Sequence, residues 1–168
     1  LSRFRNNTVT EADINKLNSR LNTEQKFYNL TEFQIFLTST NALAEEINHE
    51  HLNKLEGITY CANAVIDGSF NQESYPNSEE LYFRTGAQIM FLNNDSKNRW
   101  VNGSLGYIEK IFLENGRIKH VSVRLMSNRK LVEVFPYSWE IFKYTMEGKE
   151  IISEVIGSFT QFPFRLAW

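Results

Sequence analysis

The chain has 168 residues and a mass of 19.7 kDa, which is enough for one ordinary domain or two small ones and too little for a two-domain nucleotide motor. Its 42% apolar and 23% charged residues, with only three prolines, exclude a disordered or repetitive chain. The net charge of −2 excludes a surface that is basic all over, so any nucleic-acid site must be local.

The chemistry-bearing residues exclude several other classes of site. Cys61 is the only cysteine, so no internal disulfide forms, and three scattered histidines do not have zinc-ligand spacing. We therefore expect a reducing, cytoplasmic environment, and Cys61 is predicted to be a buried small hydrophobe. No carboxylate pair has a histidine or nucleophile partner, so we assign no catalytic residue. No apolar run approaches the roughly 18 residues of a membrane span, and a membrane partner is not expected.

The first third of the chain contains two predicted helices and one strand. Thr10 can cap a helix that carries Ile14, Leu17 and Leu21 on one face. The apolar run 33–38 (FQIFLT) predicts a strand, and Ser39, Thr40 and Asn41 follow it directly as N-cap residues. A second helix is predicted from there to about Leu55, with the apolar residues Leu43, Ile47, Leu52 and Leu55 on its buried side. This order is typical of an α/β unit.

From about residue 58 the apolar period changes from 3.6 to 2. Short β-rich runs cover residues 58–66, 86–92, 105–113, 118–125, 131–136 and 155–161. Turn pairs such as Asp67-Gly68 and Asn115-Gly116 separate them, and Asn115-Gly116 is the strongest hairpin signal. The pattern predicts a small antiparallel barrel or sandwich.

Charge divides the chain as well. Residues 58–83 contain no Lys or Arg, whereas residues 84–130 carry nine basic groups against three acidic ones, a local excess of +6. The nine are Arg84, Lys97, Arg99, Lys110, Arg117, Lys119, Arg124, Arg129 and Lys130. We expect this middle segment to be a separate unit with its own partner.

Three stretches resemble one family, the RecD-type and related branch of superfamily 1 DNA helicases. Residues 36–41 (FLTSTN) running into 44–48 (AEEIN) resemble the strand and helix that open the second RecA-like domain. Residues 86–95 (GAQIMFLNND) followed by 100–106 (WVNGSLG) are similar to the family's "GxxVMxxxN…xxNGxxG" signature, and are the most specific match. Residues 159–168 (FTQFPFRLAW) resemble the return strand that precedes a TxHKxQG motif.

The resemblance implies a mixed α/β fold in four segments. A helical flank (1–28) would precede a partial second RecA-like motor domain (29–83), which carries an SH3-like antiparallel β-barrel insert (84–160) and resumes in a return strand (161–168). It implies an ATP-dependent helicase, active in DNA repair and recombination, whose missing N-terminal motor domain and single-stranded DNA are the partners. The chain has no phosphate loop, lacks a methionine at its start and ends on an apolar segment. We therefore expect a piece of a longer protein that has no cofactor of its own, whereas the full-length protein uses ATP and Mg²⁺.

The first candidate DNA site is the strand-to-helix junction at Ser39, Thr40 and Asn41. Free amides and the helix dipole favour an anion there, such as a backbone phosphate. Helix capping alone remains the alternative.

The second candidate site surrounds Trp100. Lys97 and Arg99 place two cations beside a large aromatic face, and Asn102 follows in a turn. Base stacking with phosphate neutralisation is how sequence-independent single-strand binding works. The alternative is that Trp100 fills the barrel core and Asn102 is purely structural.

The third candidate site is a stripe of cations on the outer face of the predicted hairpin and the turn after it. It comprises Arg117, Lys119, Arg124, Arg129 and Lys130. Such a stripe can follow a phosphate backbone, although a solvated strand face explains it equally well. A different function, an SH3-like module that binds a protein or peptide, also remains open.

Overall fold

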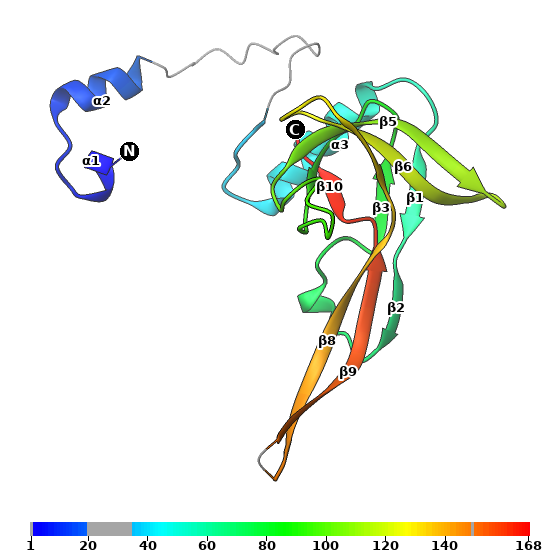
Figure 1. Ribbon diagram of the computed structural model, residues 1–168. Helices are drawn as coiled ribbons and strands as arrows, with labels where there is room; N and C mark the ends of the chain where they lie inside the picture. The colour runs from blue at the N-terminus through cyan, green and yellow to red at the C-terminus, as the bar shows by residue number, and fades with distance from the viewer. Residues whose placement is uncertain (1, 20–34, 149) are drawn as a thin grey trace. The chain divides into compact units, whose positions relative to one another are not determined.

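The computed structural model describes residues 2–19, 35–148 and 150–168, and the chain divides into two units, Leu1–Phe33 and Gln34–Trp168 (Figure 1). The first unit contains α1 (Ser2–Arg5) and α2 (Glu11–Asn18). Thr10 caps α2 in a reciprocal box, because its hydroxyl accepts from the Asp13 amide while the Asp13 carboxylate accepts from the Thr10 amide. The predicted helix is confirmed, with Ile14 and Leu17 exposed; Leu21 lies outside the described residues.

The second unit begins with an extended segment and α3 (Asn41–Lys54). Residues 35–38 do not form the predicted strand, and the Leu37 side chain is 96% exposed. A strand needs a hydrogen-bonded neighbour. No described strand pairs with residues 35–38, which explains the difference. The predicted helix is confirmed, with Leu52 buried and Ile47 and Leu55 half-buried, but the prediction that Leu43 lies on the buried side is wrong, because Leu43 is exposed.

Ten strands follow, arranged in antiparallel pairs. They are β1 (Tyr60–Asn63), β2 (Val65–Gly68), β3 (Glu80–Phe83), β4 (Gln88–Phe91), β5 (Leu105–Glu114), β6 (Arg117–Leu125), β7 (Leu131–Val134), β8 (Tyr137–Glu147), β9 (Glu150–Gln161) and β10 (Phe164–Leu166). A short 3-10 helix, η1 (Gln72–Ser74), lies between β2 and β3. Strands β3 and β8 were not predicted.

The strands form three sheets instead of one barrel. Their orders are β1-β3, β10-β4-β5-β6-β7 and β2-β9-β8. The mixed α/β class and the antiparallel β region are therefore confirmed. The five-stranded sheet does not close on itself in the described part of the chain, because β10 and β7 are its two edges. The SH3-like barrel that the resemblance implies is thus not confirmed.

Two turn predictions have different outcomes. Asn115 and Gly116 have φ values of 51° and 75°, and Glu114 pairs with Arg117 across them, so this hairpin is confirmed. Gly68 instead ends β2 and pairs with Gly157 of β9. A Cβ on Gly68 would lie 2.3 Å from the Ile156 carbonyl oxygen, so the close approach of β2 and β9 requires a glycine there.

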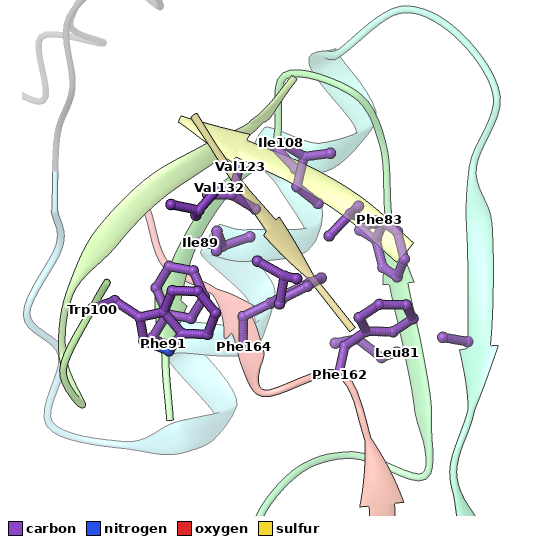
Figure 2. Packing of buried hydrophobic residues seen from close by; sticks show 14 of the residues in the cluster. Leu81, Phe83, Ile89, Phe91, Trp100, Ile108, Val123, Val132, Phe162 and Phe164 are labelled. Atoms are coloured by element: carbon purple, nitrogen blue, oxygen red, sulfur yellow. The ribbon is translucent and has the colours of Figure 1, made fainter. Parts of the chain in front are cut away.

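The hydrophobic core lies between the five-stranded sheet, α3 and the β1-β3 pair (Figure 2). Phe83 packs edge-to-face on Phe162 and Phe164, with ring centroids 5.9 and 5.5 Å apart. Gln161 is buried beside them and donates from Nε2 to the Ala62 carbonyl at 2.9 Å. These contacts attach the end of β9 to the β1-β3 pair.

The predicted segment boundaries relate to this core in two ways. Residue 84 follows Phe83, and residue 160 lies two positions before Phe162, whose ring is in contact with that of Phe83. The five-stranded sheet nevertheless contains both β4 and β10, which lie on opposite sides of the boundary at residue 160. The division into four segments stays a prediction.

Alternation within β1 explains the one wrong burial prediction in this region. Ala62 points into the core, so its neighbour Cys61 is exposed instead of buried. The Cys61 thiol lies 3.5 Å from Asn63 Oδ1.

None of the described helices is long and apolar enough to cross a membrane.

Candidate nucleic-acid interface

The loop between β4 and β5 is organised by one buried carboxylate, Asp95. It accepts hydrogen bonds from the Lys97 and Arg99 amides at 3.1 and 3.0 Å, and from Arg99 Nε and Nη2 at 2.8 and 2.7 Å. The Arg99 side chain, more than any other group, holds the pKa of Asp95 at about 2. The loop is therefore fixed by a charged pair before any ligand arrives.

Trp100 lies in the core. Its ring is only 6% exposed and stacks on Phe91 with centroids 4.4 Å apart, while the Arg99 guanidinium lies 4.4 Å from the same ring centroid. The Phe91 ring and the Arg99 guanidinium cannot both lie on one face of the Trp100 ring at these distances, so both faces of that ring are occupied. Trp100 Nε1 donates to Asn93 Oδ1 at 3.1 Å. The structure therefore matches the alternative interpretation of Trp100, and a stacked base has no free ring face there.

The neighbouring turn is also structural. Gly103 has a φ of 86°, and its amide donates to the Phe91 carbonyl at 2.8 Å. The Asn102 amide donates to Asn94 Oδ1 at 2.8 Å, and the Asn102 residue is exposed. Lys97 is exposed as well. Of the four residues predicted around this site, Lys97 and Asn102 are thus the exposed ones.

Two of the cations in the predicted stripe are neutralised by carboxylates. Arg124 donates to both carboxylate oxygens of Glu109, with Nη2 2.6 Å from Oε1 and 2.7 Å from Oε2. Lys119 Nζ lies 2.6 Å from Glu114 Oε1. Both pairs lie on the β5-β6 hairpin. A phosphate that approached Arg124 or Lys119 would have to compete with these carboxylates.

The remaining cations of the stripe lie at its two ends. Arg117 begins β6, whereas Arg129 and Lys130 occupy the turn after it, so about 27 Å of strand separates the two positions. All three are exposed, and within the described residues none has a carboxylate partner closer than 4 Å. The structure does not bring the five predicted cations into one stripe.

Cations from two different loops border β7. Arg99 Nη1 donates to the Glu133 carbonyl at 3.0 Å, which places the Asp95 loop against this edge strand. Arg129 and Lys130 lead directly into β7. We call Lys97, Arg99, Arg129 and Lys130 the β7-edge cluster. Lys97 and Arg99 were expected in the second candidate site, and Arg129 and Lys130 in the third.

The strand-to-helix junction is separate from this cluster. Thr40 Oγ1 accepts from the Leu43 amide at 3.3 Å, so Thr40 caps α3 as in the alternative interpretation. Ser39, Thr40 and Asn41 are all exposed. α3 is linked to β10, because Asn48 Nδ2 donates to the Leu166 carbonyl at 3.2 Å. β10 and β7 are the opposite edges of the sheet.

Sequence reasoning missed a row of stacked rings across the outer face of β5, β6 and β7. His120 stacks on Phe112 and on Phe135, with centroids 4.3 and 5.0 Å apart, and Lys110 Nζ lies 4.8 Å from the Phe112 centroid. The row ends at Phe135, whose side chain is half-exposed just beyond β7. It adds an aromatic face to the β7 edge.

The described residues hold no group of three or more His, Cys, Asp or Glu side chains that is arranged to bind a metal ion. The sequence has no phosphate loop to hold a nucleotide. Among the described residues, the geometry thus offers electrostatic and stacking contacts to a ligand.

Comparison with known proteins places these features in context. No protein-family model matches the chain. The chain is 29% identical over 150 residues to "ATP-dependent DNA helicase Pif1" of Campylobacter jejuni, covering 83% of this chain and 33% of the relative. It is also 25% identical over 130 residues to the Pif1 helicase of Bdellovibrio bacteriovorus, covering 74% and 27%. The chain therefore spans about a third of the length of these relatives.

Solved structures give the same result over nearly the whole chain. Unliganded Pif1 from Bacteroides sp is 32% identical, with a TM-score of 0.85, 99% of this chain covered and 37% of that one. A Bacteroides Pif1 bound to single-stranded DNA is 30% identical at the same coverage, with a TM-score of 0.67. These similarities confirm the expectation of a segment similar to superfamily 1 DNA helicases, and the peptide-binding alternative is not favoured.

Proposed function

We propose that this chain is a segment of an ATP-dependent DNA helicase and that it contributes the grip on single-stranded DNA. The observation that carries the proposal is the match of 99% of the chain to Bacteroides Pif1, at 30 to 32% identity, in a set of structures that includes one bound to single-stranded DNA. The finer assignment is to the RecD-like branch of superfamily 1, in which the β4 to β9 region is the SH3-like insert of the second motor domain.

The β7-edge cluster supplies the grip in this proposal. Lys97, Arg129 and Lys130 are exposed cations without a close carboxylate in the described part of the chain, so they can neutralise backbone phosphates. Phe135 takes the stacking role that the sequence suggested for Trp100, because its ring is half-exposed beyond the same edge. Phosphate contacts and one stacked base together are typical of sequence-independent single-strand binding.

The motor functions lie outside these residues. ATP and Mg²⁺ would be held by the N-terminal motor domain of the full-length protein, because this chain has neither a phosphate loop nor a described metal-ligand cluster. The exposed apolar side chains of Ile35 and Leu37 would then pair with strands of the complete RecA-like sheet. The 168-residue chain alone is expected to have no DNA-stimulated ATPase activity.

A titration of oligothymidine against salt tests the grip. For single strands, each phosphate contact contributes roughly 0.7 to the slope of log K against log salt. The double variant Lys97→Ala/Lys130→Ala should therefore reduce the slope by about 1.4. Lys119→Ala is the matched control, since Glu114 already neutralises this lysine, and its slope should equal that of the wild type.

Two results would contradict the assignment. Equal slopes for the double variant and the wild type would remove the cluster from the DNA site. Oligothymidine binding that is independent of salt in the wild type would show that phosphates are not what this surface recognises.

A further inference from the structure

The distal part of the β8-β9 hairpin is a two-stranded ribbon. β2 pairs with β9 only from Gly157 to Thr160, so the third strand of this sheet ends where Gly68 meets Gly157. Beyond that point β8 and β9 pair only with each other, from Phe142 opposite Val155 to the turn. We call residues 142–155 the β8-β9 arm. Figure 1 shows it extending past the end of β2.

The base of the hairpin is well packed, in contrast to the arm. Phe159 is fully buried and contacts Phe70, Tyr75 and Trp139, with ring centroids 5.8, 4.8 and 6.2 Å away. Gly157 is also buried, and a Cβ there would lie 2.6 Å from the Ser69 carbonyl oxygen. The arm is therefore anchored firmly at one end, which fixes the direction in which its strands leave the sheet.

One face of the arm is an apolar ladder, in which Ser153 opposite Tyr144 is the one polar residue. Met146 pairs with Ile151 across the strands, and both are almost fully exposed, at 74% and 72%. Tyr144, at 68%, and the directly opposed pair of Phe142 and Val155 extend the same face toward the base. Exposed apolar surface of this kind on a folded protein marks an interaction site.

The opposite face has a different character. Lys143 lies opposite Glu154, and Thr145 lies opposite Ile152. Because side chains alternate along a strand, these residues point away from the ladder. An isolated two-stranded hairpin is only marginally stable in water, so a partner that covers the ladder would also stabilise the arm.

Charge argues against a nucleic acid as that partner. The arm, residues 142–155, has a net charge of −1, with carboxylates at Glu147, Glu150 and Glu154 against two lysines. Phosphates would be repelled by this segment, whereas the β7-edge cluster attracts them. Charge complementarity instead favours an apolar protein surface bordered by basic side chains.

Area argues against a separate protein. Each strand of the arm contributes six residues, so its face measures roughly 20 by 10 Å, or about 200 Å² before side-chain relief is counted. A stable interface between free partners needs about 800 Å² per side. A surface of this size suffices when the partner is tethered, because the effective concentration of a linked domain reaches the millimolar range.

We propose that the apolar ladder of the β8-β9 arm docks on an apolar, basic-rimmed surface of another domain of the same polypeptide. This inference rests on the proposed function, in which about two thirds of the full-length protein lies outside these residues, as it does in the relatives. The arm then acts as a strut that links the DNA-gripping segment to the rest of the motor.

Hydrogen exchange on the full-length protein and on the 168-residue chain tests the docking. Amides of residues 142–155 should exchange at least tenfold more slowly in the full-length protein. The variant Met146→Thr/Ile151→Thr should abolish that protection while keeping the β propensity of the strands. Ile152→Thr is the matched control on the opposite face and should leave the protection intact. Equal urea midpoints for the isolated chains would confirm that each variant folds.

Three outcomes would overturn the proposal. Unchanged exchange of the arm in the full-length protein would show that no domain covers it. A dimer of the 168-residue chain in sedimentation, lost in the double variant, would identify a second copy as the partner. Protection that appears only with oligothymidine would identify DNA. DNA-stimulated ATPase activity of the full-length protein is measured in parallel; its absence would defeat the proposed function and leave the docking result standing.

Discussion

The five-stranded sheet and the β8-β9 arm are built from the same residue types and have opposite environments. Phe164 and Ile89 in the sheet are fully buried, whereas Tyr144 and Ile151 in the arm are largely exposed. Strand alternation is present in both. The difference is long-range cover: α3 and the Phe83 and Phe162 rings lie over the sheet core, and no described element lies over the arm. Hydrophobicity therefore identifies the strands, and topology decides which of them form the core.

The largest expected effect is in the Phe cluster. Phe164→Ala removes a ring that packs on Phe83 and Phe162 and leaves a cavity, so it should lower the free energy of unfolding by about 3–5 kcal/mol. Urea unfolding followed by tryptophan fluorescence measures this. A loss below 1 kcal/mol would mean that the core is not centred on these rings.

In the Asp95 loop, a charged pair stabilises the fold, as apolar packing does in the five-stranded sheet. The pKa of Asp95 falls from 3.8 to about 2 on folding, chiefly through the hydrogen bonds from the Arg99 side chain. A depressed carboxyl pKa stabilises the fold above pH 4 by about 2 kcal/mol, and this contribution disappears as the pH falls toward 2.

Asp95→Asn should therefore remove that part of the acid dependence of unfolding. Glu109→Gln is the control, since the Glu109–Arg124 pair is screened by solvent and should contribute little to stability. Parallel acid profiles for the wild type and Asp95→Asn would contradict the role assigned to Asp95.

The smallest effect is expected in the arm. Tyr144→Thr in the 168-residue chain should change the free energy of unfolding by no more than about 0.5 kcal/mol, because the side chain is already 68% exposed. The same urea titration as for Phe164→Ala gives the value. A loss that approaches the Phe164→Ala value would show that the arm is packed in solution, and the contrast between the two regions would fail.

Local signals in the sequence predicted the elements that depend on local chemistry. The Thr10 and Thr40 caps and the Asn115-Gly116 hairpin are confirmed, because capping and left-handed turn geometry need only neighbouring residues. The strand at 33–38 and the closed barrel depend on distant partners, and the structure shows neither in the described residues.

The candidate site was only partly predictable for the same reason. Lys97, Arg129 and Lys130 were identified from composition, but the contact of Arg99 with β7, which places the Asp95 loop against that strand, could not be. The row of stacked rings at Phe112, His120 and Phe135 was missed because a β-bulge in the β5-β6 pair decides which residues lie opposite each other. A two-residue turn at Asn115-Gly116 alone would pair Phe112 with Lys119, whereas the bulge pairs Phe112 with His120.

In the proposed function, this chain grips DNA for a motor whose ATP site lies elsewhere in the polypeptide. ATPase assays with oligothymidine on the full-length protein and on the 168-residue chain test it most directly. We predict DNA-stimulated ATP turnover by the full-length protein and none by the 168-residue chain. In the full-length protein, Lys97→Ala/Lys130→Ala should raise the DNA concentration needed for half-maximal stimulation. Lys119→Ala should leave that concentration unchanged. Turnover by the purified 168-residue chain, or a full-length ATPase indifferent to DNA, would contradict the account.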